Sequence, residues 1–534
     1  MPLAGIVKWF WALTVKERVV TRLGFVLDSD SCIGCHACTV ACKSEHDVPI
    51  GVNRTWVKYI ETGQFPDVSR KFSVMRCNQC EDAPCMKICP TSALYRADNG
   101  VVDFDDDDCI GCKSCMNACP YDALYINPET NTAHKCNMCN HRIEVGLLPS
   151  CQIVCPTEAI KIGDLDDPTS DISKIIARDD VAVRSPEQNT KPKVYYRGAD
   201  QASLDPTRSA IANDGMIWAD TTPAHSSLSV AAGSTPLDIE GVVARTAYTT
   251  AHQMTWKSKV AGYLVTKGIA AGVMLVAALL VLMGHADSQA AVGVIPPVLA
   301  GFFLAVTGVL LIWDLKQPTR FHYLITKGNW TSWLVKGAYI LMAFALICGL
   351  WFLGGVASSS TLVTWLAIPA VLGALGTAGY TAYLFAQCEG RDLWQTPLLL
   401  PTLLAQAATA GGATYALIDL FVDVPEPQVA PWVMLGGVLA VAALLGIELT
   451  GQAPRTVELA LHEMTRGQWA NQFWLGGILL GLVIPAVTAV VALSIGIDNS
   501  TSPVLLTIGA LAALVGMYAY EDAFVRSGQS VPLS

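Results

Sequence analysis

Sixteen of the 18 cysteines in this 534-residue chain fall between Cys32 and Cys155, and they form four groups of four. The groups read Cys32-x2-Cys35-x2-Cys38-x3-Cys42, Cys77-x2-Cys80-x4-Cys85-x3-Cys89, Cys109-x2-Cys112-x2-Cys115-x3-Cys119 and Cys136-x2-Cys139-x11-Cys151-x3-Cys155. Four thiolates are the ligand set of a [4Fe–4S] cluster. The first and third groups share one spacing, and the second and fourth are stretched versions of it. The pattern therefore predicts four [4Fe–4S] clusters.

The spacing follows from how such a cluster is held. Each thiolate bonds one iron, so three cysteines in a tight loop reach three irons, and the fourth points away to the other cluster of a two-cluster unit. Small residues such as Gly34, Ala37 and Gly111 let the backbone approach the sulfurs. Disulfides do not explain the repeat, and zinc fits only the fourth group loosely. The other two cysteines, Cys348 and Cys388, are predicted to be apolar packing residues.

The two halves of the chain differ sharply in composition. The whole chain is 52% hydrophobic and 15% charged with a net charge of −10, whereas soluble domains are about 25% charged. The first 256 residues hold 24 Lys and Arg against 32 Asp and Glu, and the remainder hold 11 against 13. The acidic balance argues against nucleic-acid binding. Composition thus predicts an acidic soluble head followed by a membrane half.

The back half divides into eight apolar runs, and about 20 residues suffice for a helix to cross a bilayer. The runs are 260–283, 292–313, 333–353, 362–386, 398–421, 430–450, 473–495 and 503–520. Their alternative, buried helices of a soluble protein, would require eight such runs in succession within one core. The predicted fold is an α+β ferredoxin-like tandem of two two-cluster units, followed by an all-α bundle of eight transmembrane helices.

Four segments follow from this division. They are an N-terminal arm or interfacial helix at 1–23, the cluster domain at 24–165, an extended linker at 166–255 and the transmembrane domain at 256–534. The apolar start has no twin arginine and no cleavage site, so we expect no signal peptide. The linker is either plain or draped over the protein by Val194-Tyr195-Tyr196 and Met216-Ile217-Trp218.

Residues 24–165 resemble the iron–sulfur electron-transfer subunits of the dimethyl sulfoxide reductase superfamily. The matching segments are Cys32-Ile33-Gly34-Cys35-His36-Ala37-Cys38, Asn53-Arg54-Thr55-Trp56-Val57, Arg76-Cys77-Asn78-Gln79-Cys80 and Cys136-Asn137-Met138-Cys139-Asn140-His141-Arg142. The resemblance implies four ligand sets that exchange cysteines between groups. The first to fourth ligand sets would be Cys32, Cys35, Cys38 and Cys155; Cys136, Cys139, Cys151 and Cys42; Cys77, Cys80, Cys85 and Cys119; and Cys109, Cys112, Cys115 and Cys89.

The back half resembles the NrfD-like membrane subunits of polysulfide reductases. The matching segments are Lys267-Gly268-Ile269-Ala270-Ala271-Gly272, Asp314-Leu315-Lys316-Gln317-Pro318-Thr319-Arg320-Phe321, Thr331-Ser332-Trp333 and the ending 527–534. This resemblance implies a membrane subunit without haem that oxidises or reduces a quinone, either menaquinone or ubiquinone. The apolar runs contain no histidine, which independently argues against a bis-histidine haem.

Ionisable residues in the membrane runs are candidates for the quinone pocket. Lys267 lies about 10 Å into the first run at 1.5 Å per residue, and Tyr263 is one turn before it. We expect His252, Tyr263 and Lys267 near the quinone, and Asp314 and Glu448 in proton delivery. The alternatives are that Lys267 snorkels or pairs with Asp314, that Tyr263 is a belt aromatic and that His252 belongs to the linker.

Loop charges predict the orientation of the bundle. The loops on the side where the first helix begins hold nine Lys and Arg, whereas the opposite loops, 284–291, 354–361, 422–429 and 496–502, hold none. The positive-inside rule therefore places the head in the cytoplasm, at the inner membrane. Export with a partner that carries its own twin-arginine signal is the alternative.

Taken together, these features predict the electron-transfer and membrane-anchor subunit of a respiratory oxidoreductase. A separate catalytic subunit of molybdopterin or tungstopterin type would act on the substrate, and electrons would pass through four clusters to or from a quinone. The alternatives are a membrane hydrogenase subunit and a redox-driven proton pump.

Overall fold

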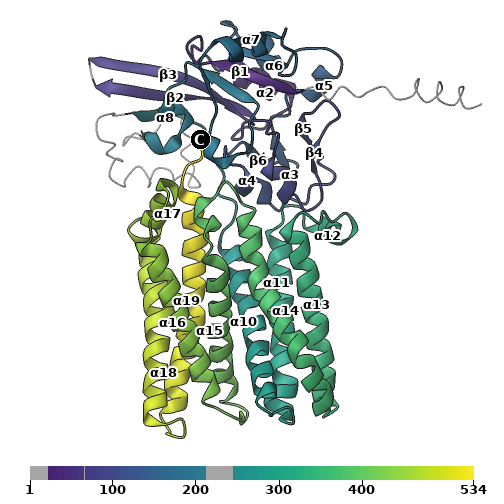
Figure 1. Ribbon diagram of the computed structural model, residues 1–534, viewed down its shortest axis with the longest axis vertical. Helices are drawn as coiled ribbons and strands as arrows, with labels where there is room; N and C mark the ends of the chain where they lie inside the picture. The colour runs from purple at the N-terminus through teal and green to yellow at the C-terminus, as the bar shows by residue number, and fades with distance from the viewer. Residues whose placement is uncertain (1–21, 65, 212–243) are drawn as a thin grey trace, which may run out of the picture.

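The computed structural model describes residues 22–64, 66–211 and 244–534. A head of strands and short helices sits on one end of a bundle of long helices (Figure 1). The predicted arm at 1–23 lies outside the described residues except for its last two residues, and so does Met216-Ile217-Trp218.

One four-stranded sheet closes the part of the head farthest from the bundle. Strand β1 (Leu23–Asp28) pairs antiparallel with β8 (Ile160–Asp164) and parallel with β10 (Val194–Arg197), which carries β9 (Val181–Ala182) at the edge. The register places Phe25 opposite Ile162 on one side and Val194 on the other. Because Phe25, Val194 and Tyr196 are all buried, this sheet forms a wall of the head's core.

A second sheet has the order β11-β12-β2-β3. Strands β2 (Thr55–Gln64) and β3 (Asp67–Arg76) form a long antiparallel hairpin, and β12 (Arg245–Tyr248) pairs with β2 and with β11 (Ala210–Ile211). Two further ribbons pair β4 (Leu94–Arg96) with β5 (Val102–Phe104), and β6 (Leu124–Ile126) with β7 (Ala133–Lys135).

The segment expected to be an extended linker, 166–255, is instead built into the head where the structure describes it. Its helix α7 (Asp171–Arg178) begins at the capping Ser170, and β9, β10 and β12 complete the two sheets. Val194 and Tyr196 do anchor the segment, because β10 pairs with β1 and both side chains are buried in the core of the head. The sequence does not reveal these strands, because a strand of two to four residues is too short to show the alternation of buried and exposed side chains.

All eight predicted apolar runs form helices in the bundle. They are α10 (Ser258–Leu282), η4 (Gln289–Val294) with α11 (Ile295–Asp314), α13 (Trp333–Val356), α14 (Ser360–Ala386), α15 (Leu399–Ile418), α16 (Val429–Thr450), η7 (Gln472–Val483) with α18 (Ile484–Ile495), and α19 (Ser502–Ser530). Seven of them are long and apolar enough to span a membrane, and α15 is the exception. Helix α15 is buried among its neighbours and carries polar residues such as Gln406.

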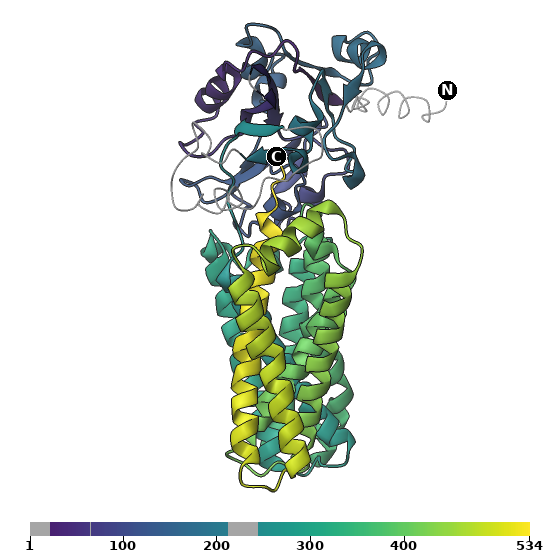
Figure 2. The same cartoon turned by 90° about the vertical axis from the view of Figure 1, so that its left-hand side faces the viewer.

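Helix α10 is the centre of the bundle and packs against α11, α14, α15 and α19. Its contact with α15 is a close backbone approach, since a Cβ on Gly272 would lie 2.0 Å from the Ala407 carbonyl oxygen. Only glycine permits this approach. Helix α19 continues ten residues beyond the predicted end at 520 and reaches the head, where the C-terminus lies at the junction (Figure 2).

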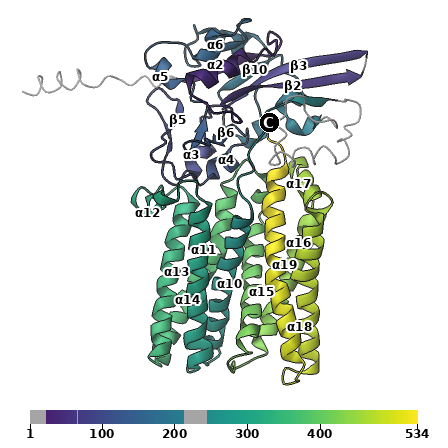
Figure 3. The same ribbon diagram turned by 180° about the vertical axis from the view of Figure 1, so that it is seen from behind.

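The connection between α11 and α13, residues 315–332, lies against the head. It contains α12 (Tyr323–Thr326) and faces the loops that carry the second and third cysteine groups (Figure 3). Backbone amides of Lys316 and Asn329 donate to the carbonyls of Gly111 and Pro90. Arg320 donates to the carbonyls of Asp106 and Cys109. The head and the bundle are therefore joined directly beside the cysteines.

Candidate functional site

The cysteines of the four groups lie in tight loops and in the short helices that follow them. Cys38 and Cys42 lie in α2 (Ala37–Glu45), Cys85 in α3 (Pro84–Ile88), Cys115 in α4 (Ser114–Ala118) and Cys151 in α6 (Ser150–Ile153), while Cys139 caps α5 (Asn140–Ile143). In each loop at least one residue between cysteines has a positive φ, as in His36 at 58° and Lys113 at 66°. Such left-handed residues gather at functional sites.

Thiols of the first two implied sets lie close enough to interact. Burial raises the pKa of Cys32, and the charges of Cys155 and Cys35 raise it further. Burial likewise raises the pKa of Cys42. The neighbours of Cys42 that add to this rise are Cys136, Cys151 and Cys139. The structure thus brings Cys42 to the fourth cysteine group, far from it in sequence.

The thiols of the third and fourth implied sets also lie close enough to interact. Burial raises the pKa of Cys119 to about 12, and Cys77 and Cys80 are the thiols that add to the rise. Burial raises the pKa of Cys112 to about 12, and Cys89 and Cys109 act in the same direction. Like charges so close together oppose ionisation. A cluster that binds the thiolates removes this penalty.

Neighbouring sets also interact in order. Electrostatic interactions join Cys38 of the first set to Cys151 of the second, Cys136 of the second to Cys77 of the third, and Cys115 of the fourth to Cys85 of the third. The series ends at the bundle, where Cys388 interacts with Cys112. Four adjoining groups of thiols therefore run from the head to the membrane half.

The donor set fits iron–sulfur clusters. Within residues 22–64, 66–211 and 244–534, no three His, Cys, Asp or Glu side chains are placed to hold a single metal ion. A [4Fe–4S] cluster bonds its thiolates at four different irons and so needs them farther apart. Backbone amides also point at the sulfurs, as from Ala133 to Cys109 at 3.4 Å and from Ala159 to Cys155 at 3.3 Å.

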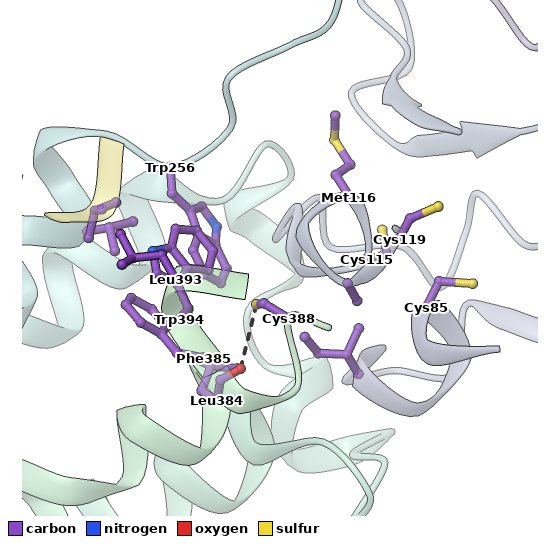
Figure 4. Packing of buried hydrophobic residues seen from close by; sticks show 14 of the residues in the cluster. Cys85, Cys115, Met116, Cys119, Trp256, Leu384, Phe385, Cys388, Leu393 and Trp394 are labelled. Atoms are coloured by element: carbon purple, nitrogen blue, oxygen red, sulfur yellow. Dashed lines mark hydrogen bonds between the residues drawn. The ribbon is translucent and has the colours of Figure 1, made fainter. Parts of the chain in front are cut away.

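Aromatic side chains fill the junction between the fourth set and the bundle (Figure 4). Trp256 stacks on Phe385 and Trp394 with ring centroids 5.6 and 5.4 Å apart, and its indole nitrogen donates to the Cys112 carbonyl. Cys388 lies between these rings and the helix of Cys115. Cys388 is fully buried and its thiol donates to the Leu384 carbonyl, so it packs as predicted.

A buried polar cluster lies just inside the bundle from this junction. The Lys267 ammonium donates to the Ala378 carbonyl at 2.9 Å and to the Thr381 hydroxyl at 2.6 Å, and it lies over the Tyr380 ring. Tyr263 interacts with the same Thr381, so the structure brings Tyr263 and Lys267 together. Lys267 is 1% exposed, which excludes snorkelling.

The other three predicted residues lie around this cluster rather than in it. Asp314 pairs with Lys113 of the head and not with Lys267. Glu448 lies against Tyr520 and Thr396, and one of its oxygens has no hydrogen bond. His252 sits at the head–bundle junction, where its imidazole bonds Asp122 at 2.8 Å and the Ser534 hydroxyl at 2.9 Å.

His252 also lines a cavity of about 70 Å³ at this junction. The cavity is lined by Lys58, Asp122 and Arg391 as well. Burial lowers the pKa of Lys58 to about 7, and the nearby charge of Arg184 lowers it further, while Asp205 opposes both. The pKa of Asp122 stays below its usual range despite burial, because His252 and two arginines act on the carboxylate.

Sequence reasoning missed several buried polar residues. Glu521 in α19 is buried and interacts with Gln406 and with Lys267, and one of its oxygens has no hydrogen bond. Thr381 and Tyr380 complete the surroundings of the ammonium. The signal for Glu521 was present, because an acidic pair follows the last apolar run directly. Thr381 and Tyr380 gave none, since threonine and tyrosine are common in membrane helices.

Known proteins are similar to this chain in two separate parts. Residues 68–165 match the family described as a 4Fe-4S dicluster domain, and residues 247–531 match the family described as polysulphide reductase, NrfD. Protein NrfC of Escherichia coli K12 is 43% identical over 177 residues, which are 33% of this chain and 79% of that protein. The thiosulfate reductase electron transfer subunit PhsB of Salmonella typhi is 42% identical over 173 residues, with coverages of 32% and 89%. The arsenate respiratory reductase iron-sulfur subunit ArrB of Shewanella sp. ANA-3 is 36% identical over 225 aligned residues, with coverages of 33% and 95%.

A ferredoxin-like head that carries iron–sulfur clusters, joined to a bundle of membrane helices, defines an electron-transfer subunit and its membrane anchor in one chain. The second match spans more than half of the 534 residues, and the chain belongs to the NrfD polysulphide reductase family. The fusion expected from the sequence is thereby confirmed, as is the fold class of each part. The protein crosses the membrane several times.

Proposed function

We propose that this chain carries electrons, one at a time, through four [4Fe–4S] clusters between a separate catalytic oxidoreductase subunit and a quinone in its membrane half. The observation that carries this proposal is the unbroken series of interacting thiols from Cys38 to Cys112 and on to Cys388. When bound, the clusters supply one-electron carriers. The ligands would be the four sets that the sequence implies.

The catalytic partner would dock at the exposed end of the series. Cys35 is the exposed member of the sixteen cysteines. Exposed apolar side chains surround the same loops, among them Ile33, Val40, Ile153 and Val154. A contiguous exposed apolar patch marks an interaction site. A partner seated here would reach the first ligand set without crossing the protein.

The partner's type rests on the relatives. PhsB is by name a subunit of a thiosulfate reductase, and ArrB is by name a subunit of an arsenate respiratory reductase. We extend this role to the present chain and expect a catalytic subunit with a molybdopterin or tungstopterin cofactor, as the superfamily resemblance implies. The proposed role is the same for any substrate of that subunit and for either direction of electron flow.

The quinone would bind beside Tyr263, Lys267 and Thr381. Their polar groups lie inside the bundle next to Cys388, where the series of thiols ends. A quinone needs hydrogen-bond donors for its carbonyls within an apolar surround. The Lys267 ammonium and the Tyr263 hydroxyl would donate these bonds. Glu521 and Glu448 would hold the protons that accompany two-electron reduction.

The buried polar groups favour proton uptake over proton pumping. Lys267, Tyr263, Glu448 and Glu521 lie in the parts of α10, α16 and α19 that face the head. In the described part of the bundle, the acidic residues at the opposite end lie in or beside the loops, as Asp423 and Asp498 do. A route that begins on the head side and ends at the quinone is what this distribution supports.

The membrane and the orientation follow from the loop charges. The basic residues Lys316, Arg320 and Lys327 lie on the head side, where they also contact the head. The positive-inside rule would then place the head in the cytoplasm, with the chain in the inner membrane. Protease treatment of inside-out and right-side-out vesicles distinguishes this orientation from an exported head.

The cluster count has a direct test. The purified full chain is expected to hold about 16 iron and 16 acid-labile sulfide atoms, four of each for every [4Fe–4S] cluster. Replacing Cys85 with serine should remove one cluster's signal from the electron paramagnetic resonance spectrum. An unchanged iron content in that variant would contradict the assigned ligand sets.

A further inference from the structure

Arg76 ends strand β3 and points into the head between two groups of thiols. It is 0% exposed. Its Nη1 atom donates to the Cys151 Sγ at 3.4 Å, and the guanidinium lies over the Phe25 ring at 4.4 Å from the centroid. Its Nε and Nη2 atoms have no hydrogen-bond partner among the described residues. Arg76 therefore keeps two buried donors without a partner on a guanidinium that contacts a cysteine sulfur.

No carboxylate balances this charge. A buried ion without a counter-charge costs several kcal/mol, and in the described part of the head Arg76 forms no ion pair with Asp or Glu. The groups near enough to balance its charge when ionised are the thiols of Cys151, Cys136 and Cys38. Cys38 belongs to the first ligand set, and the other two belong to the second. The counter-charge of Arg76 is thus shared between two sets.

The geometry places this charge beside both sets. Arg76 donates to the Cys151 sulfur of the second set and lies over Phe25, and Cys38 of the first set packs in the same buried cluster as Cys151 and Phe25. A guanidinium remains protonated at all accessible pH values, so its charge is a fixed feature of the site.

Other buried cations near the cysteines direct their hydrogen bonds to oxygen or nitrogen. Arg54 bonds His134, Lys135 bonds the carbonyls of Val102 and Cys136, and Arg184 bonds the Leu533 carbonyl. Among the described residues, Arg76 is the one Lys or Arg whose side chain donates to a cysteine sulfur. This contact with a sulfur distinguishes Arg76 from the other buried cations of the head.

We propose that Arg76 is a positioning residue that raises the reduction potentials of the first and second clusters. The inference rests on the proposed cluster assignment. One-electron reduction adds one negative charge to a cluster, and a fixed positive charge in contact with its sulfur stabilises the reduced form. The electron comes from, or returns to, the catalytic partner or the quinone. Arg76 thereby makes the exposed end of the series the more favourable place for an electron.

The test is a redox titration of the full chain in detergent, with mediators and dithionite, followed by electron paramagnetic resonance. In R76M the equilibrium for reducing one or two clusters should weaken at least tenfold, which is about 59 mV to more negative potential for one electron. R76K keeps a positive charge but loses the planar fork, and its shift should be smaller. The matched control is R184M, which removes an equally buried guanidinium with no cysteine contact among its hydrogen bonds.

Iron and sulfide content separate this inference from the cluster assignment. R76M with full iron content and unshifted potentials overturns the role of Arg76 and leaves the four-cluster proposal intact. If R76M loses a cluster, the neutral polar variant R76Q decides, and unshifted potentials in R76Q overturn the role. A parent protein with fewer than four clusters overturns the cluster assignment instead. A shift in R184M as large as in R76M would show a general effect of buried charge and also overturn the inference.

Discussion

Lys113 and Asp314 form an ion pair across the junction of the two halves, with 2.7 Å between Nζ and Oδ2. Lys113 lies between two cysteines of the third group, and Asp314 is the last residue of α11. Both side chains are largely buried, at 6% and 18% exposed. The pair therefore ties a cysteine loop of the head directly to a membrane helix.

Replacing Asp314 with asparagine should loosen the head from the bundle. Burial lowers the pKa of Lys113, and Asp314 is the partner that opposes this. Removing one member of a largely buried pair leaves the other unpaired, at a cost of about 2 kcal/mol in this partly exposed geometry. The expected readout is a lower thermal midpoint of the detergent-solubilised chain. K113M/D314N should recover part of the loss, and K174M, at an exposed position on α7, should change little. A D314N midpoint equal to the parent's would refute the role of the pair.

Stability should depend on pH through Lys58. Its folded pKa is about 7 because burial disfavours the ammonium, whereas the unfolded value is near 10.4. Between these values the unfolded state binds more protons, so stability rises with pH from about 7 to about 10. At the low end of this window the charged, buried lysine carries a penalty of roughly 5 kcal/mol at most.

K58M removes this penalty. The variant should unfold at a higher temperature than the parent at pH 6.5, and its advantage should shrink as the pH is raised to about 9. K71M, which changes a partly exposed lysine on the neighbouring strand, is the matched control and should show no such dependence. A constant difference between K58M and the parent across this range would be evidence against a depressed pKa.

The sequence was sufficient to locate the membrane helices and the cysteine loops. A long apolar segment is stable in a bilayer as an α-helix, because the helix satisfies its own backbone hydrogen bonds. For this reason, most of the predicted runs begin and end within a few residues of the observed helices. Cysteine spacing is a local property of a loop. The apolar runs and the cysteine spacings can therefore each be recognised from a short stretch of sequence.

Long-range pairing was beyond the sequence. Asp314 was expected to deliver protons, yet it binds Lys113, which is 201 residues away. Strands as short as β9 and β12 form because β1, β10 and β2 supply their partners. Glu521 was missed because the last apolar run was ended at residue 520, while packing against the head keeps α19 helical to Ser530. Each of these features depends on residues brought together only by folding.

Charged substitutions in the exposed patch should release the catalytic partner. I33D and V154D place a carboxylate at exposed apolar positions that adjoin Cys32 and Cys155 of the first implied set in sequence. Burying an unpaired charge in an interface costs at least a few kcal/mol, so the amount of co-purifying large subunit should fall at least tenfold. V68D introduces the same charge at an exposed position on β3 and should leave co-purification unchanged. Full recovery of the partner with I33D and V154D would place its docking surface elsewhere.

Lys267 should be required for quinone chemistry and not for cluster assembly. A hydrogen bond from a charged donor contributes roughly 1.5–3 kcal/mol, so K267M should slow quinol-driven reduction of the clusters at least tenfold. K267R should retain part of the rate. K336M, which removes a cation stacked on Trp333 at the start of α13, is the control. Iron content equal to the parent's in all three variants would confirm that the defect lies in the membrane half, whereas an unchanged rate in K267M would remove Lys267 from the site.

The most direct measurement is the anaerobic addition of a short-chain menaquinol or ubiquinol to the purified chain without its catalytic partner. Cluster absorbance and electron paramagnetic resonance are followed over time. The proposed function predicts that the quinol reduces those clusters whose potentials lie above its own, and that a hydroxyquinoline oxide blocks this reduction. Dithionite serves as the positive control for cluster reduction. Clusters that respond to dithionite but to neither quinol would contradict a quinone site in this chain and reduce the membrane half to an anchor.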